Sequence, residues 1–166
     1  PSVRRAKRYV KPPIDLLRSA AESEQATKER YDYEQNGRAK KLIDTLASFG
    51  VGAKVSAVLR GPAVTRYEVQ PNPGVKVSKI VSLSDDIALN LAATGVRIEA
   101  PIPGKEAVGI EVPNKEVEIV YLRDVIGSKE YRDSASKLTF AIGKDIAGKN
   151  IVADIAKMPH LLIAGA

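Results

Sequence analysis

The apolar residues change their spacing near Gly50. From Arg38 to Phe49 they recur at intervals of three and four, which predicts one amphipathic helix that Gly50 ends. After Gly52 the interval becomes two, because KVSAVLR and AVTRYEV alternate on either side of Gly61-Pro62. Alternation around a tight turn predicts two paired strands. A helix that runs into a hairpin indicates an α+β fold.

The region after this hairpin predicts further short elements. NPGVKVSKIVSL fits either a strand or a short helix, and both interpretations stay open. Ser82 or Ser84 is expected to cap the next helix, with Asp85 and Asp86 in its first turn, where carboxylates favour the positive end of the helix dipole. This helix, IALNLAA, is apolar on nearly every side. We therefore expect it to be buried in the core or against a neighbouring subunit, with Ile87 and Leu91 as interface candidates.

The second half of the chain predicts several strands. VRIEAPI and AVGIEVP flank Pro103-Gly104-Lys105-Glu106, which indicates a hairpin. VEIVYL is another strand candidate, and LRDVIGSKEYRD predicts a short helix followed by a polar loop. LTFAIGK and NIVADIA follow as further strand candidates, separated by turn residues. The run LLIA lies between Pro159 and Gly165, a pattern typical of a strand buried on both faces of a parallel sheet.

Positive charge is concentrated at the start of the chain. The formal net charge of the 166 residues is +6, and residues 1–11 carry five basic groups and no acid. The remainder is nearly neutral, so this arm is either a solvated linker or a contact for a polyanion. The candidates for phosphate contacts are Arg4, Arg5, Lys54, Arg60, Lys76 and Lys79. Solvated surface charge is the competing interpretation for all of them.

Other residue types exclude whole classes of site. The chain has no cysteine and a single histidine, His160, which excludes disulfides, thiolate zinc sites, a cysteine nucleophile and any histidine cluster. No apolar run approaches the length of a membrane span, so we expect a soluble chain. Asp85 and Asp86 are adjacent and point about 100° apart on a helix, which favours capping over paired acid and base catalysis.

Three long motifs identify a family. GPAVTRYE from Gly61, the block from Val81 to Asn114, and LTFAIGKDIAGKNIVADIAKMPHLLIAGA from Leu138 resemble the FtsK/SpoIIIE family of bacterial DNA translocases. They occur in the family's order, and PPIDLL also resembles the segment that leads into its motor region. The resemblance extends from about Tyr9 to the last residue.

The resemblance implies a division of the chain and a function. Residues 1–30 would be a basic, proline-containing linker, 31–125 the alpha domain, and 126–166 the incomplete start of a RecA-like ATPase domain. The fold would be α+β, with a mixed, largely antiparallel sheet and two or three helices, followed by the first strands of the α/β RecA-like domain. The motor would form a homo-hexameric ring around double-stranded DNA and serve chromosome segregation at division or sporulation.

The same resemblance places the nucleotide site at the end of the chain. Gly165 and Ala166 would open the P-loop that binds ATP and Mg in the full-length protein, although an apolar strand before Gly-Ala also fits an ordinary strand end. The P-loop lysine and its Ser or Thr are missing, so we expect the chain alone to be inactive, with no catalytic or metal-binding residue and no cofactor. We expect a cytoplasmic location, with the full-length protein anchored in the bacterial inner membrane at the septum.

Two roles remain open for these residues. Arg66 is expected to pair with an acid across a subunit interface, to face the DNA channel, or to pair locally with a carboxylate such as Glu68. For the chain as a whole, the alternative to a motor segment is a non-enzymatic oligomerisation or adaptor domain with weak, non-specific DNA binding. It would dock through the helix from Ile87 to Ala93 and the hairpin around Pro103.

Overall fold

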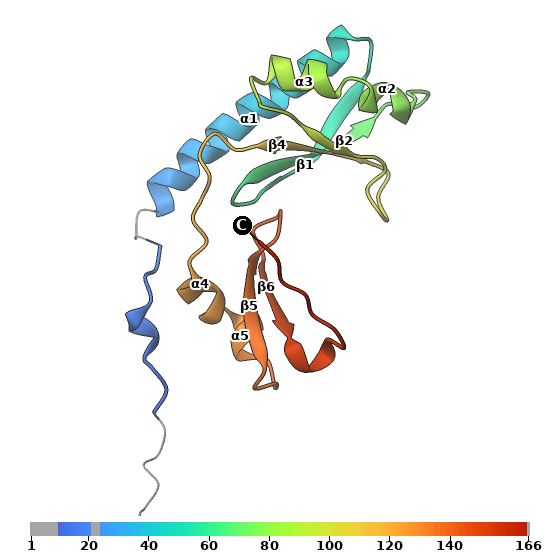
Figure 1. Ribbon diagram of the computed structural model, residues 1–166. Helices are drawn as coiled ribbons and strands as arrows, with labels where there is room; N and C mark the ends of the chain where they lie inside the picture. Colours follow the sequence, from blue (N-terminus) through green and yellow to red (C-terminus); the bar gives the residue numbers. More distant parts are fainter. Residues whose placement is uncertain (1–9, 21–23, 166) are drawn as a thin grey trace, which may run out of the picture.

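The computed structural model describes residues 10–20 and 24–165, with side chains within the first helix described from Asn36 onward. Its main unit is an antiparallel sheet with strand order β1-β2-β4-β3 (Figure 1). The strands are β1 (Ala53–Arg60), β2 (Val64–Pro71), β3 (Arg97–Glu99) and β4 (Val108–Pro113). Both predicted hairpins are confirmed, and the first closes through a hydrogen bond from the Gly61 amide to the Val64 carbonyl at 2.9 Å. The α+β fold class is confirmed.

Helix α1 (Glu24–Ser48) is longer than its apolar pattern predicted. Residues 24–37 lack an apolar period, but they are rich in Glu, Gln, Lys, Arg and Ala, which have high helix propensity. The helix therefore begins well before Arg38. It ends as expected at Gly50, which has a φ of 70°, and the Val51 amide bonds back to the Leu46 carbonyl at 2.9 Å.

The ambiguous segment after the first hairpin folds as helix α2 (Val77–Val81), and α3 (Ser84–Asn90) follows it. Asp85 and Asp86 lie in the first turn of α3, as predicted. The predicted serine cap is wrong, because Leu83 is the N-cap residue and makes no side-chain cap bond. The Ser82 hydroxyl instead donates to the Lys79 carbonyl at 2.9 Å, which closes α2.

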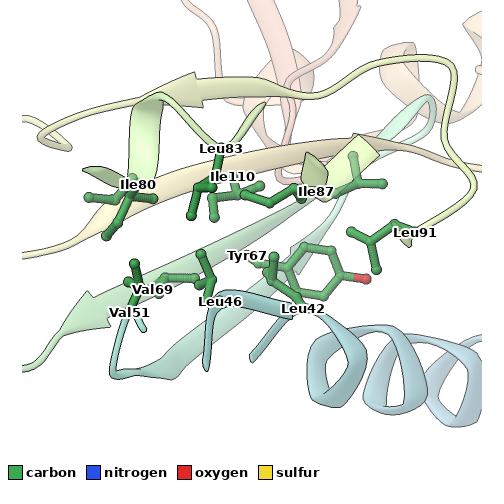
Figure 2. Packing of buried hydrophobic residues seen from close by; sticks show 12 residues of the cluster. Leu42, Leu46, Val51, Tyr67, Val69, Ile80, Leu83, Ile87, Leu91 and Ile110 are labelled. Carbon is green, nitrogen blue, oxygen red and sulfur yellow. The ribbon is translucent and has the colours of Figure 1, made fainter. Parts of the chain in front are cut away.

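The hydrophobic core lies between the sheet and these helices. Figure 2 shows Tyr67 and Val69 of β2 facing Leu42 and Leu46 of α1, while α2 and α3 contribute from the other side of the cluster. The side chains of Leu42, Leu46, Tyr67 and Val69 are all fully buried. The buried cluster comprises Leu42, Leu46, Val51, Tyr67, Val69, Ile80, Leu83, Ile87, Leu91, Val108, Ile110 and Val112. Each of these large apolar groups contributes about 1.5–3 kcal/mol by leaving water.

The last part of the chain forms a smaller unit. Helices α4 (Leu122–Ile126) and α5 (Lys129–Arg132) precede a two-stranded antiparallel sheet of β5 (Thr139–Lys144) and β6 (Asn150–Asp154). Figure 1 shows this hairpin on the side of the four-stranded sheet opposite α3. Two single-turn 3-10 helices, Ile14–Leu16 and Ile155–Lys157, complete the described elements.

Two strand predictions are wrong. Residues 117–122 form no strand, and Val117 and Ile119 are exposed. Residues 161–165 are also irregular, and Leu162 is 91% exposed although the pattern predicted burial on both faces. A doubly buried strand needs neighbours for its backbone N–H and C=O groups, and no strand of the described chain pairs with this run.

In the part of the chain that the structure describes, no helix combines the length and apolar character needed to cross a membrane.

Candidate functional site

The face of the sheet opposite the core carries a network of charged side chains. Alternate residues of a strand point to opposite faces, so Tyr67 enters the core while Arg66 and Glu68 lie on the other face. The Arg66 guanidinium donates to Glu99 Oε2 from Nη2 and to Glu111 Oε1 from Nη1, the latter at 3.3 Å. The second Glu111 oxygen accepts from Arg97 Nη1 at 2.9 Å.

Glu68 has a separate partner in this network. Lys105 Nζ donates to both carboxylate oxygens of Glu68, at 2.7 and 2.8 Å. Lys105 lies in the loop between β3 and β4, so this ion pair ties the loop to β2, one of the two central strands of the sheet. Of the alternatives for Arg66, the described structure therefore contains local pairing, but with Glu99 and Glu111 and not with Glu68.

Gly109 makes room for the Arg66 side chain. It is paired with Glu68 on β2 and with Glu99 on β3. A methyl group added at Gly109 would lie 2.8 Å from both Nε and Nη2 of Arg66. Arg66 and Glu111 are only 8% and 6% exposed, so the guanidinium has little room to move aside.

The charges of this network are largely satisfied within the chain. Hydrogen bonding to Glu111, followed by the charge of the same carboxylate, raises the pKa of Arg97 above its ordinary value. Among the described residues, Nε of Arg66 is buried without a hydrogen-bond partner. The roles of Arg66 at a subunit interface or in a DNA channel stay predictions, and its two Nη groups are already engaged inside the chain.

Three of the predicted phosphate-contacting residues gather at one end of the sheet. Lys54 lines a groove of about 610 Å³ that also includes Val77 of α2. Lys76 and Lys79 line a second groove of about 550 Å³ on the same helix, where Lys79 Nζ donates to the Gly50 carbonyl at 3.2 Å. All three lysines are exposed. We call these three lysines the basic edge; Glu106 also lines the groove of Lys54, and contacts of the lysines to phosphates stay a prediction.

Arg60 does not belong to this basic edge. It lies at the opposite end of β1 from Lys54, about 20 Å away at the usual rise of a strand. Its Nε forms an ion pair with Glu118 Oε1 at 3.0 Å. Arg4 and Arg5 lie outside the described residues.

The interface candidates of α3 lie inside the molecule. Ile87 is fully buried and Leu91 is 4% exposed, both in the core of this chain. The outward face of α3 instead presents Leu89, which is 80% exposed, and the adjacent helix α2 presents Val77 and Val81. Sequence reasoning missed Leu89, although helical spacing separates it from Ile87 by about 200° around the axis.

The end of the described chain shows no assembled nucleotide site. Gly165 follows the exposed run 161–164, and Ala166 lies outside the described residues. Within the described ranges, no three His, Cys, Asp or Glu side chains gather in a way that could hold a metal ion.

Comparison with known families assigns both parts of the chain. Residues 11–114 match the family model of the FtsK alpha domain, and residues 121–166 match that of the FtsK/SpoIIIE family. The chain belongs to the FtsK/SpoIIIE family. The match to the alpha domain covers the four-stranded sheet with α1, α2 and α3, and the second match covers α4, α5 and the β5–β6 hairpin.

Curated relatives carry the name DNA translocase FtsK. The protein of Caldanaerobacter subterraneus subsp. tengcongensis is 58% identical over 158 residues, which is 95% of this chain and 22% of the relative. That of Clostridium acetobutylicum is 60% identical over 158 residues, 95% of this chain and 20% of the relative. That of Oceanobacillus iheyensis is 62% identical over 127 residues, 76% of this chain and 16% of the relative. The chain thus spans about a fifth of the length of such relatives.

Proposed function

We propose that this chain is the alpha domain and the start of the motor domain of an ATP-dependent translocase for double-stranded DNA. The observation that carries the proposal is the pair of family matches, which follow each other along the chain and together leave only short stretches unmatched. The intact motor would be a homo-hexamer that moves chromosomal DNA during division or sporulation. The boundary between its two domains would lie near residue 125.

The alpha domain would build the ring and brace the motor. This assignment is supported by the charged face of the sheet, where Arg66 pairs with Glu99 and Glu111, and Glu68 pairs with Lys105. Such groups stabilise one arrangement of strands and leave no free catalytic pair. Contacts to DNA would come from the basic edge at Lys54, Lys76 and Lys79 and from the amino-terminal arm, through phosphates only.

ATP and Mg would be held by the longer protein and not by these residues. Every Gly-Lys pair in the sequence is followed by Glu, Asp or Asn, so the chain contains no Gly-Lys-Ser or Gly-Lys-Thr motif. Gly165 and Ala166 supply only the first two positions of a P-loop. The residues present therefore do not fit a complete ATP site, and the proposal gives this chain no catalytic step.

Location follows from the same proposal. The chain would lie in the cytoplasm, and other segments of the longer protein would anchor it in the inner membrane at the septum.

The test compares the chain with the native protein that contains it. DNA-stimulated release of phosphate from ATP is measured for both at equal molar concentration. We expect hydrolysis by the native protein and none by residues 1–166 alone. Hydrolysis by the chain alone would refute its assignment as an inactive segment, and a native protein without DNA-stimulated hydrolysis would refute the translocase assignment.

A second candidate function, a non-enzymatic oligomerisation domain, is favoured by the exposed side chains of Leu89, Val77 and Val81. Sedimentation equilibrium of the isolated chain separates the two. Stable assembly in the absence of nucleotide and DNA supports self-association as an activity of these residues. A monomer at all concentrations would rule out self-association as an activity of these residues on their own.

A further inference from the structure

The turn between β1 and β2 meets the tip of the β5–β6 hairpin. The tip is a closed turn, because the Asp145 amide bonds to the Lys149 carbonyl at 2.9 Å and the Gly148 amide bonds to the Asp145 carbonyl at 3.0 Å. The Asp145 carboxylate accepts from the amides of Ala147 and Lys149, both at 2.9 Å. Such side-chain bonds to the local backbone fix the shape of a turn.

Each side of this contact contains a glycine, Gly61 in the β1–β2 turn and Gly148 in the tip of the hairpin. A methyl group at Gly61 would lie 2.5 Å from the Ile146 carbonyl oxygen and 2.8 Å from its carbonyl carbon. A methyl group at Gly148 would lie 3.2 Å from the Arg60 carbonyl oxygen, and Gly148 has a φ of 80°. Backbone packs on backbone here, which only glycine allows.

The segment that connects the two units is bonded to the same turn. Asn114 Nδ2 donates to the Gly61 carbonyl at 2.9 Å, and Asn114 Oδ1 accepts from the Thr65 hydroxyl at 2.7 Å. Further along, the Glu118 amide donates to the Pro62 carbonyl at 2.8 Å, and the Glu118 carboxylate pairs with Arg60. Asn114 and Thr65 are buried, so the two bonds of Asn114 are shielded from water, whereas the Arg60–Glu118 ion pair is exposed.

The geometry points to a fixed joint between the alpha domain and the start of the motor domain, centred on Gly61. We call the contact of Arg60, Gly61 and Pro62 with residues 146–148, together with the bonds of Asn114 and Glu118, the Gly61 joint. It holds the β5–β6 hairpin at one angle to the four-stranded sheet. In a motor, such a joint passes movement of the ATPase domain to the alpha domain, and this part of the inference rests on the proposed function.

The joint is tested first in the chain itself, by distances between spin labels. Because the sequence has no cysteine, Lys54→Cys and Lys137→Cys give two defined label positions, on the sheet and at the far end of the hairpin from the joint. We expect a narrow distance distribution that Gly61→Val broadens about twofold, because the side chain forces the tip away. Gly95→Ala is the matched control, since a methyl group there meets no atom within 4 Å. Circular dichroism confirms that each variant is folded.

A charge reversal keeps the test decisive if the valine variant does not fold. Arg60→Glu removes the ion pair with Glu118 and is expected to broaden the distribution, and adding Glu118→Arg is expected to narrow it again. If the label-to-label distance distribution is equally wide in the unsubstituted chain and in the folded Gly61→Val variant, the proposal of a fixed joint is refuted. Broadening by Gly95→Ala as large as that by Gly61→Val overturns it as well, as does an Arg60→Glu variant that stays narrow where Gly61→Val is unfolded.

The role in coupling is tested in the intact translocase that carries Gly61→Val. We expect DNA-stimulated ATP hydrolysis to remain while the DNA length transported per ATP falls several-fold. An unchanged ratio overturns the coupling role. If the unsubstituted intact protein transports no DNA, the proposed function fails, while the label distances still decide whether the joint exists.

Discussion

Gly109 lies beside Arg66 on the charged face of the sheet, where a side chain has no room. Its missing side chain is the space into which the Arg66 guanidinium fits. Arg66 in turn holds Glu99 of β3 and Glu111 of β4, so three strands depend on this space. A buried charge that loses its partner is costly, which makes this glycine a stability determinant.

Gly109→Ala is therefore expected to lower the free energy of unfolding by about 3 kcal/mol, because the guanidinium must leave its buried partners. Urea unfolding followed by circular dichroism measures the change. Gly95→Ala serves as the control and is expected to change stability little. A Gly109→Ala variant as stable as the unsubstituted chain would show that Arg66 moves aside without losing its ion pairs.

Substitutions at Leu89 and Leu91 distinguish effects on folding from effects on assembly, because Leu91 is buried and Leu89 is exposed. Leu91→Asp places a carboxylate in the core and is expected to cost about 4 kcal/mol, enough to unfold the chain or nearly so. Leu89→Asp changes an exposed side chain and is expected to alter stability by no more than about 0.5 kcal/mol.

Urea unfolding and sedimentation equilibrium are the two measurements for this pair. If the chain self-associates through α3, Leu89→Asp reduces the assembled fraction while the fold survives. Unchanged assembly of the folded Leu89→Asp variant would rule out the outward face of α3 as an interface.

The partner of Arg66 was not predictable from the sequence for a specific reason. Glu68 lies two residues away on the same strand and is the carboxylate nearest to Arg66 in the sequence. Glu111, however, sits directly opposite Arg66 on β4, and it also sits opposite Arg97 on β3. Cross-strand neighbours are set by register, and register is fixed by packing over the whole sheet.

At the level of elements, a strand-like sequence pattern predicted a strand correctly where a neighbouring strand of the chain pairs with it, and wrongly where none does. The strands around Gly61-Pro62 and around residues 103–106 formed because each pairs with its neighbour in sequence. Residues 117–121 and 161–164 have strand-like composition, but no strand of the described residues pairs with them, and they stay irregular. Only the second half of helix α1 was predicted, because its polar first half has no apolar period and is helical through residue propensity alone.

Gly37 offers a test of this account of α1. It lies within the helix, and a methyl group there meets no atom within 4 Å. Gly37→Ala is therefore expected to raise the free energy of unfolding by about 0.5–1 kcal/mol, since alanine is the better helix former. Thermal and urea unfolding measure the gain. A lower free energy of unfolding would contradict this expectation, because it would mean that the methyl group meets other atoms of the chain.

At the scale of the whole molecule, positive charge is unevenly distributed, and the proposed contact with DNA would draw on two sources of it. The amino-terminal arm carries most of the net charge, and the folded part contributes the basic edge at Lys54, Lys76 and Lys79. Each phosphate contact contributes a slope of about −0.9 to the logarithm of affinity against the logarithm of salt concentration. The two sources of charge are therefore separable by salt titration.

Removal of residues 1–11 is expected to weaken binding to double-stranded DNA of any sequence and to flatten its salt dependence. Fluorescence anisotropy with labelled duplex across a salt series measures both effects. The double variant Lys76→Gln and Lys79→Gln is the matched comparison within the folded part. Unchanged affinity after removal of the arm would assign DNA contact to the basic edge.

The sequence of the native gene beyond the codon for Ala166 tests whether these residues lead into an ATP-driven DNA motor. We expect a continuation that completes G-x-x-x-x-G-K-[ST], with Gly165 as the first glycine of the P-loop. A stop codon or an unrelated continuation would contradict the translocase assignment for this gene product and leave the oligomerisation domain in its place.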